Sequence, residues 1–121
     1  MSEPILVWSE LPVTDLDRAM TYYSAVFDWT MSLSTDGPNP VAFFCNDMET
    51  IGGHLYPGKP ATDNGPTVHL AVPDTLEDTA DRVWKAGGEV IGEAIEIPLG
   101  RFIYTKDPDG NSVGLFEAKA A

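Results

Sequence analysis

Three side chains in strand-like segments of this sequence could carry acid–base or metal chemistry, namely Glu10, His54 and His69. They include both histidines of the chain, and each lies in a mainly apolar run rather than in a polar loop. A glutamate beside a histidine in an apolar pocket can act as a general acid or base. Two histidines and one carboxylate are also the ligand set of a non-haem iron site. A structural polar pair at a sheet interface is the alternative reading.

The elements that would position these residues occur in the same order twice. Apolar periodicity and turn signals predict, first, a strand over 5–13, a helix over 14–28 and strands over 29–35, 41–45 and 50–56. They then predict a strand over 67–72, a helix over 74–86 ended by Gly87-Gly88, and strands over 89–97, 101–105 and 112–117. The segments Asn46-Asp47 and Asp107–Asn111 are predicted turns.

This repetition predicts one α+β domain over residues 1–121, built from two tandem βαβββ modules. Module 1 covers 4–57, a linker rich in proline and glycine covers 58–66, and module 2 covers 67–117. Val13-Thr14-Asp15 overlays on Val72-Pro73-Asp74. A single such module leaves one sheet face uncovered, and two modules can close against each other.

The overlay also predicts which side chains face the interior. Side chains alternate along a strand, so an inward Trp8 implies an inward Glu10, and an inward Thr67 implies an inward His69. Glu10 and His69 fall at equivalent positions of the two modules. We therefore expect them to lie near each other across a pseudo-twofold axis.

Charge and cysteine content narrow the class of protein. Seven Lys and Arg against 19 Asp and Glu give a net charge of −12 in 121 residues, which argues against nucleic-acid and anionic-membrane partners. Cys45 is the single cysteine, so no disulfide can form within the chain. No apolar stretch approaches the ~20 residues of a membrane span, and Met1–Pro4 lacks the basic start of a signal peptide. We expect a cytoplasmic protein.

Four motifs in order resemble the vicinal oxygen chelate superfamily, also called the glyoxalase/bleomycin-resistance/dioxygenase family. They are Glu10–Ala19, Tyr22-Tyr23 with Val26–Trp29, Ala86-Gly87-Gly88 and Lys106–Leu115. The resemblance covers essentially the whole chain. It implies that the two modules form a cupped, barrel-like sheet around a cavity, and that homodimers are common, a swapped arrangement included.

The resemblance also implies where metal ligands stand in the metal-dependent members. Those positions fall on Trp8, His54, Thr67 and Gly114. Trp and Gly offer no lone pair from a side chain, and Thr is a poor ligand for zinc or iron, so only His54 suits a metal. We expect no cofactor. A divalent metal on a displaced set made of Glu10, His54 and His69 is the alternative.

The remaining expectation is an aromatic cavity for a small organic ligand. The expected lining residues are Trp8, His54, Tyr56, Thr67, Arg101, Gly114 and Phe116. Plain core packing is the other reading of the aromatic residues. Arg101 and Tyr104 face opposite ways on one strand, and the pattern leaves open which looks inward. The alternative function is a lyase, isomerase or dioxygenase in which Glu10 and His69 act as acid and base with His54.

Overall fold

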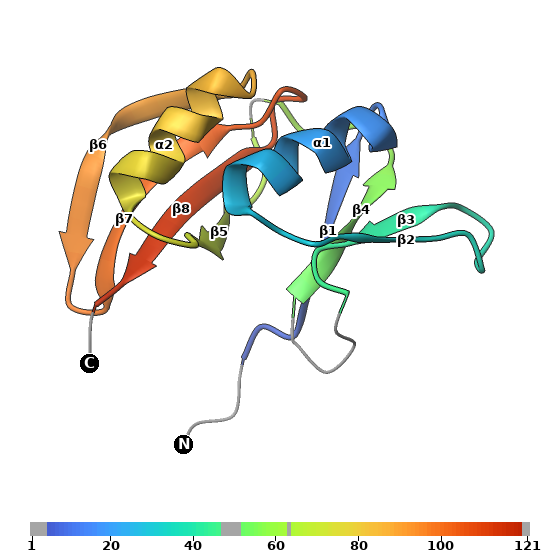
Figure 1. Cartoon of the computed structure of the whole chain (residues 1–121), viewed down its shortest axis with the longest axis horizontal. Coiled ribbons are helices and arrows are strands. Elements are labelled where there is room, and N and C mark those ends of the chain that lie inside the picture. The colour runs from blue at the N-terminus through green and yellow to red at the C-terminus, as the bar shows by residue number, and fades with distance from the viewer. Residues whose placement is uncertain (1–4, 47–51, 63, 120–121) are drawn as a thin grey trace.

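The strand–helix–three-strand unit is present twice, as expected (Figure 1). The computed structural model describes residues 5–46, 52–62 and 64–119. The expected turn at Asp47, the strand start at Thr50, and Met1–Pro4 lie outside the described residues. The first unit comprises β1 (Trp8–Val13), α1 (Leu16–Phe27), β2 (Ser32–Ser34), β3 (Val41–Phe43) and β4 (Gly52–Pro57). The second comprises β5 (Val68–Ala71), α2 (Leu76–Lys85), β6 (Glu89–Ile97), β7 (Gly100–Lys106) and β8 (Ser112–Ala118).

Each unit forms its own four-stranded mixed sheet. The strand orders are β1-β4-β3-β2 and β5-β8-β7-β6, so β1 and β5 are the corresponding edge strands. In both sheets the first and last strands of the unit run parallel, and the other pairs are antiparallel. Helices α1 and α2 lie together on the same side of the two sheets (Figure 1). Glu10, His54 and His69 lie on the opposite, concave side of the sheets, which the helices leave uncovered.

Two strands, β1 and β2, each begin three residues later than the apolar pattern predicts. The first strand begins at Trp8 rather than at Ile5, because residues 5–7 are exposed and pair with no strand among the described residues. The second begins at Ser32 rather than at Trp29. The Trp29 ring instead stacks between Phe27 and Phe44, with ring centroids 4.9 and 4.7 Å away. The apolar content of residues 5–7 therefore made the predicted first strand too long. The predicted second strand was too long because Trp29 packs in the core instead.

Local capping sets the ends of both helices. The Asp15 carboxylate accepts a hydrogen bond from the Arg18 backbone N–H (3.0 Å) and begins α1, and Thr75 does the same for the Asp78 N–H (3.1 Å) in α2. After α2, Gly87 adopts a positive φ of 98°, which a residue without Cβ takes at no steric cost. The expected glycine stop is confirmed.

The core lies between each helix and the face of its own sheet that the helix covers. Burying each large apolar side chain there stabilises the fold by roughly 1.5–3 kcal/mol. The fully buried apolar side chains of the first unit are Val13, Tyr23, Val26, Phe27, Ala42 and Leu55; those of the second are Leu76, Val83, Val113 and Leu115. Neither helix in the described part of the chain is long and apolar enough to cross a membrane.

The turn Asp107–Asn111 does more than reverse the chain, since it fastens the second unit to the first; we call it the inter-module clamp. Tyr23 O–H donates to Asp107 Oδ2 (2.7 Å) from inside α1. Asn111 Nδ2 donates to the same oxygen (3.0 Å) and to the Pro12 carbonyl at the end of β1 (2.8 Å). Burial and the nearby Asp107 carboxylate raise the pKa of Tyr23 well above its usual value, so the phenol remains a donor.

Two arginines complete this contact on the helix side. Arg18 of α1 donates to the largely buried Asp109 carboxylate of the clamp (2.8 Å). Arg82 of α2 donates through Nε to the Val26 carbonyl of α1 (2.9 Å). These hydrogen bonds between the units come from the clamp and the helices, while β1 and β5 are left unpaired along their facing edges.

Candidate functional site

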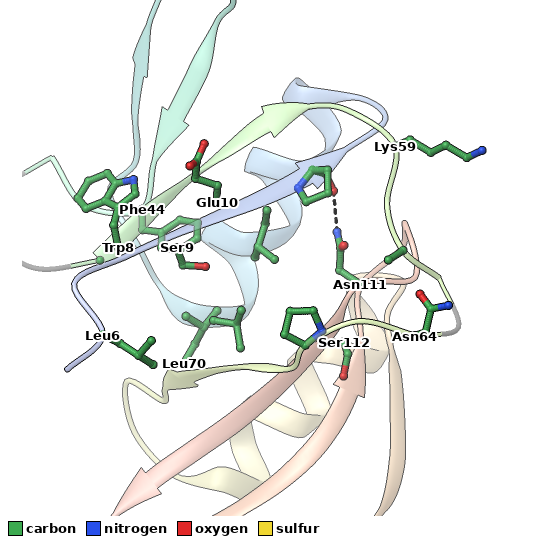
Figure 2. A pocket seen from close by; sticks show the side chains of 16 residues that line it. Leu6, Trp8, Ser9, Glu10, Phe44, Lys59, Asn64, Leu70, Asn111 and Ser112 are labelled. Atoms are coloured by element: carbon green, nitrogen blue, oxygen red, sulfur yellow. Dashed lines mark hydrogen bonds between the residues drawn. The ribbon is translucent and has the colours of Figure 1, made fainter.

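A crevice of about 600 Å³ runs between the unpaired edges of β1 and β5 (Figure 2). Leu6, Leu11 and Leu70 contribute much of its apolar wall. Trp8 and Glu10 lie toward one end, while Lys59 and Asn64 lie toward the other (Figure 2). The remaining described lining residues are Ser9, Pro12, Phe44, Gly52, Ala61, Pro66, Val68, Asn111 and Ser112.

Trp8 and Glu10, which line the crevice, form a hydrogen-bonded chain with His54 of β4. Trp8 Nε1–H donates to His54 Nδ1 (3.0 Å), and His54 Nε2 lies 3.2 Å from Glu10 Oε1. The parallel register of β1 and β4 places Glu10 directly beside His54 on the same face. The His54 side chain is 15% exposed and the Glu10 side chain 65% exposed, so the carboxylate meets solvent while the imidazole is covered.

Aromatic rings enclose the imidazole in this chain. Phe43 on β3 and Tyr56 on β4 contact His54 edge-on, with ring centroids 6.0 and 6.2 Å away. The Trp8 ring lies 5.9 Å from the same imidazole and is 43% exposed. Trp8, His54 and Tyr56 therefore lie on the same face of the first sheet, as expected. Because Trp8 is exposed and Tyr56 only half-buried, these rings line a surface rather than fill the core.

His69 occupies the corresponding face of the second sheet and has different neighbours. Its ring lies against Phe102, Tyr104 and Phe116, with centroids 4.9, 5.9 and 6.3 Å away. Gly114 is its cross-strand partner, and a Cβ at that position would collide with the imidazole. Burial lowers the pKa of His69 from its ordinary value. The absence of a side chain at position 114 is thus what makes room for this ring.

Glu10 and His69, which we expected to lie near each other, have different neighbours in the structure. The two residues do stand at equivalent positions, since Glu10 pairs with His54 and His69 pairs with Gly114 across parallel strands. Within residues 5–46, 52–62 and 64–119, however, the hydrogen-bond partner of Glu10 is His54, and no hydrogen bond or ion pair joins Glu10 to His69.

Of the four positions that correspond to the family metal ligands, only His54 carries a side chain that suits a metal. The Trp8 indole has no lone pair to offer and points its N–H at His54, and Gly114 has no side chain. Thr67 directs its hydroxyl to Ser112, 2.5 Å away. Among the described residues, no group of three His, Cys, Asp or Glu side chains is arranged to hold a metal ion.

Arg101, which we expected among the ligand-contacting residues, lies on the helix-covered face of the second sheet and pairs with carboxylates there. Its guanidinium forms a bidentate pair with Glu77 of α2 (2.6 and 2.7 Å) and a further contact with Glu117 of β8 (3.0 Å). Those carboxylates raise the pKa of Arg101 above its usual range. On the same strand, Tyr104 faces His69. Tyr104, rather than Arg101, therefore faces the concave side.

Sequence reasoning missed several crevice residues for a geometric reason. A crevice between two strand edges is lined by side chains from both faces of β1, so Ser9 and Leu11 belong to it together with Trp8 and Glu10. Alternation along a strand assigns only one face to a cavity. Phe43 and Phe102 were also not singled out, although their neighbours on the same strands indicated apolar faces.

Comparison with known proteins agrees with this architecture. Residues 5–115 match the family model described as "Glyoxalase/Bleomycin resistance protein/Dioxygenase superfamily". A Mycobacterium bovis protein that carries the name glyoxylase CFP32 is 37% identical over 108 residues, which is 87% of this chain and 41% of that protein. The chain therefore spans about two-fifths of the length of that relative.

Solved structures share the fold at lower sequence identity. A glyoxalase/bleomycin resistance protein from Albidiferax ferrireducens T118 superposes with a TM-score of 0.70 at 18% identity, covering 96% of this chain and all of that one. The fosfomycin resistance protein FosX from Mesorhizobium loti superposes with a TM-score of 0.65 at 21% identity, covering 98% and 95%. Given the family match over nearly the full length and the repeated βαβββ unit, this chain belongs to the glyoxalase/bleomycin resistance protein/dioxygenase superfamily.

Proposed function

We propose that this chain binds a small, largely apolar organic ligand in the crevice between β1 and β5. The crevice itself is the observation that carries the proposal. Its volume of about 600 Å³ falls within the roughly 300–1,000 Å³ of typical ligand sites. Its wall combines leucine and valine side chains with the Trp8 ring and a few polar groups at the ends. Apolar walls with few convergent polar groups are the usual composition of such sites.

The binding is proposed to be independent of a metal at the usual family positions. The donor chemistry supports this, since Trp8 and Gly114 supply no ligand atom and Thr67 is engaged with Ser112. Elemental analysis of protein purified without a histidine tag tests it. Stoichiometric iron, zinc, nickel or manganese would overturn the metal-independent reading and leave the crevice proposal to its own test.

A substitution that fills the crevice tests the binding itself. Leu70→Trp should reduce affinity for crevice ligands by at least about tenfold, because the larger ring occupies the space between the strands. Leu33→Trp on β2 is the matched control, since Leu33 is half-exposed and absent from the lining. Ligands found by thermal shift against a small-molecule collection supply the readout. Affinity unchanged by Leu70→Trp would contradict the proposal, and so would an unchanged ligand-induced shift in Trp8→Ala.

The second candidate function is an enzyme in which Glu10 exchanges protons with the ligand. The contact between His54 Nε2 and Glu10 Oε1 favours it, because a hydrogen-bonded carboxylate at the rim of an apolar crevice is placed to take or give a proton. His69 would serve as the partner acid or base from the second sheet. Conversion of a bound ligand, followed by NMR and lost in Glu10→Gln, would separate this function from binding alone.

The proposal extends to assembly and location. A homodimer, swapped or not, is supported by the apolar side chains exposed on β6, among them Ile91 and Ile95. Light scattering after size-exclusion chromatography tests it, and a monomer at working concentration would refute it. The single cysteine supports a reducing compartment such as the cytoplasm.

A further inference from the structure

The chain of Trp8, His54 and Glu10 has a fixed direction. An indole N–H can only donate, so His54 Nδ1 must accept with its lone pair. The imidazole proton then resides on Nε2, from which it donates to Glu10 Oε1. Trp8 thereby selects one tautomer of His54 from two that would otherwise compete.

This direction determines the charge of the group. A proton on Nδ1 would point at the Trp8 N–H, and two donors would then meet at 3.0 Å. The imidazole is accordingly a neutral donor, and its contact with Glu10 is a hydrogen bond rather than an ion pair. The Glu10 carboxylate is thus paired with a neutral donor beside the crevice, not with a cation.

No cation of the described residues compensates that charge. The arginines are engaged elsewhere: Arg18 with Asp109, Arg82 with Asp74, and Arg101 with Glu77 and Glu117. Lys59 lines the crevice but lies toward its opposite end (Figure 2). The second carboxylate oxygen of Glu10 receives no hydrogen bond from residues 5–46, 52–62 or 64–119. The crevice therefore offers a carboxylate acceptor that has no cationic partner among the described residues.

The surroundings of this acceptor match one chemical class of ligand. The exposed indole of Trp8 beside Glu10 presents a π face, which attracts cations electrostatically. The protein's net charge of −12 adds a long-range attraction for positive charge. The adjoining crevice wall is apolar. We infer that the site takes a protonated amine carried on an apolar body, with the ammonium group at Glu10 and Trp8 and the body between β1 and β5. This inference rests on the proposed function, since it names the ligand class of the same crevice.

Three probes of similar size separate charge from shape: 2-phenylethylammonium, 2-phenylethanol and phenylacetate. Affinities come from amide and indole NMR shifts at neutral pH, with the Trp8 Nε1–H resonance as the local reporter. We expect the ammonium probe to bind about tenfold more tightly than the alcohol, and phenylacetate to bind most weakly. Glu10→Gln should remove the preference for the ammonium probe. Glu96→Gln, which changes net charge equally on an exposed β6 residue outside the crevice, should keep it.

The outcomes distinguish this inference from the proposed function. Equal binding of ammonium and alcohol at the crevice overturns the amine preference and leaves the crevice proposal standing. Shifts from none of the three probes overturn both. A preference for ammonium that survives Glu10→Gln overturns the assignment to Glu10.

The tautomer supplies an independent readout of the role of Trp8 as a positioning residue. Imidazole ¹⁵N spectra at neutral pH should show His54 as the Nε2–H form, assigned with a His69 variant because the chain has two histidines. Trp8→Phe keeps a ring but removes the N–H, so we expect a mixture of tautomers and a preference for ammonium weakened about threefold. An Nδ1–H form or an imidazolium in the wild-type protein would overturn the inference.

Discussion

The two modules place different residues at the same pair of positions. In the first, the parallel strands β1 and β4 bring Glu10 beside His54, and in the second, β5 and β8 bring His69 beside Gly114. The first pair forms a hydrogen-bonded chain with a charged end. The second forms an aromatic cluster without an acid, in which the histidine fills the space that a side chain at 114 would need. The same backbone arrangement thus carries a polar hydrogen-bonded chain on one sheet and an aromatic cluster on the other.

The largest effect should come from breaking the contact that holds the unlike modules together. Asp107→Ala leaves the buried Tyr23 hydroxyl and the Asn111 amide without their shared acceptor, and should lower the free energy of unfolding by about 3 kcal/mol. Asp36→Ala, in the exposed turn before β3, is the matched control. Urea denaturation measures both. A loss in Asp107→Ala no greater than in the control would show that the clamp is dispensable.

Gly114→Ala tests whether the missing side chain at this position makes room for the His69 ring. The new Cβ would meet the His69 ring and should cost roughly 1–3 kcal/mol of stability. Gly52→Ala is the control, because no atom lies within 4 Å of a Cβ built there. In the double variant His69→Ala/Gly114→Ala the collision is gone, so a double-mutant cycle should return a favourable coupling. Additive losses would mean that the ring and the glycine are independent.

Arg101→Leu tests the placement of this arginine on the helix side. Removing the guanidinium leaves Glu77 and Glu117 without their cation and should lower Tm. Affinity for a crevice ligand should stay within about twofold of wild type, since distant sites act independently. Loss of affinity with an unchanged Tm would return Arg101 to the ligand site.

The smallest effect concerns the pH dependence of the second module. Burial lowers the pKa of His69 in the folded protein below the value of 6.5 for an exposed imidazole. The unfolded chain therefore binds the proton first, and stability falls as pH drops from about 7.5 to 5.5. His69→Phe should make that fall smaller, because the variant has no imidazole to protonate. Urea denaturation at both ends of the range measures it, and an equal fall in both proteins would contradict the assignment.

The sequence predicted the repeat and the facing of residues on paired strands, because both follow from local periodicity. Glu10, His54 and His69 share the concave side for that reason. The Trp8–His54 hydrogen bond escaped prediction, since it depends on side-chain geometry across 46 positions. The facing of Arg101 stayed open because alternation fixes only relative orientation. Glu77, which settles it, lies 24 residues away on another element.

The sequence predicted that residues 107–111 form a tight turn. It did not predict the contacts of this turn with the first module. Turn signals describe the chain reversal of residues 107–111 but not what the turn touches. Its partners, Tyr23 and Pro12, lie 84 and 99 positions away from the residues they bind.

Those separations bear on how the protein is made. Contacts between residues distant in sequence form late, since the chain between them must first be brought into place. During synthesis the first module leaves the ribosome well before residues 107–111 do, and N-terminal units generally fold first. We expect the Tyr23 hydroxyl and the Pro12 carbonyl of the nascent first module to lack these partners until residues 107–111 have been synthesised. Formation of the turn at residues 107–111 is therefore the step that joins the two four-stranded sheets.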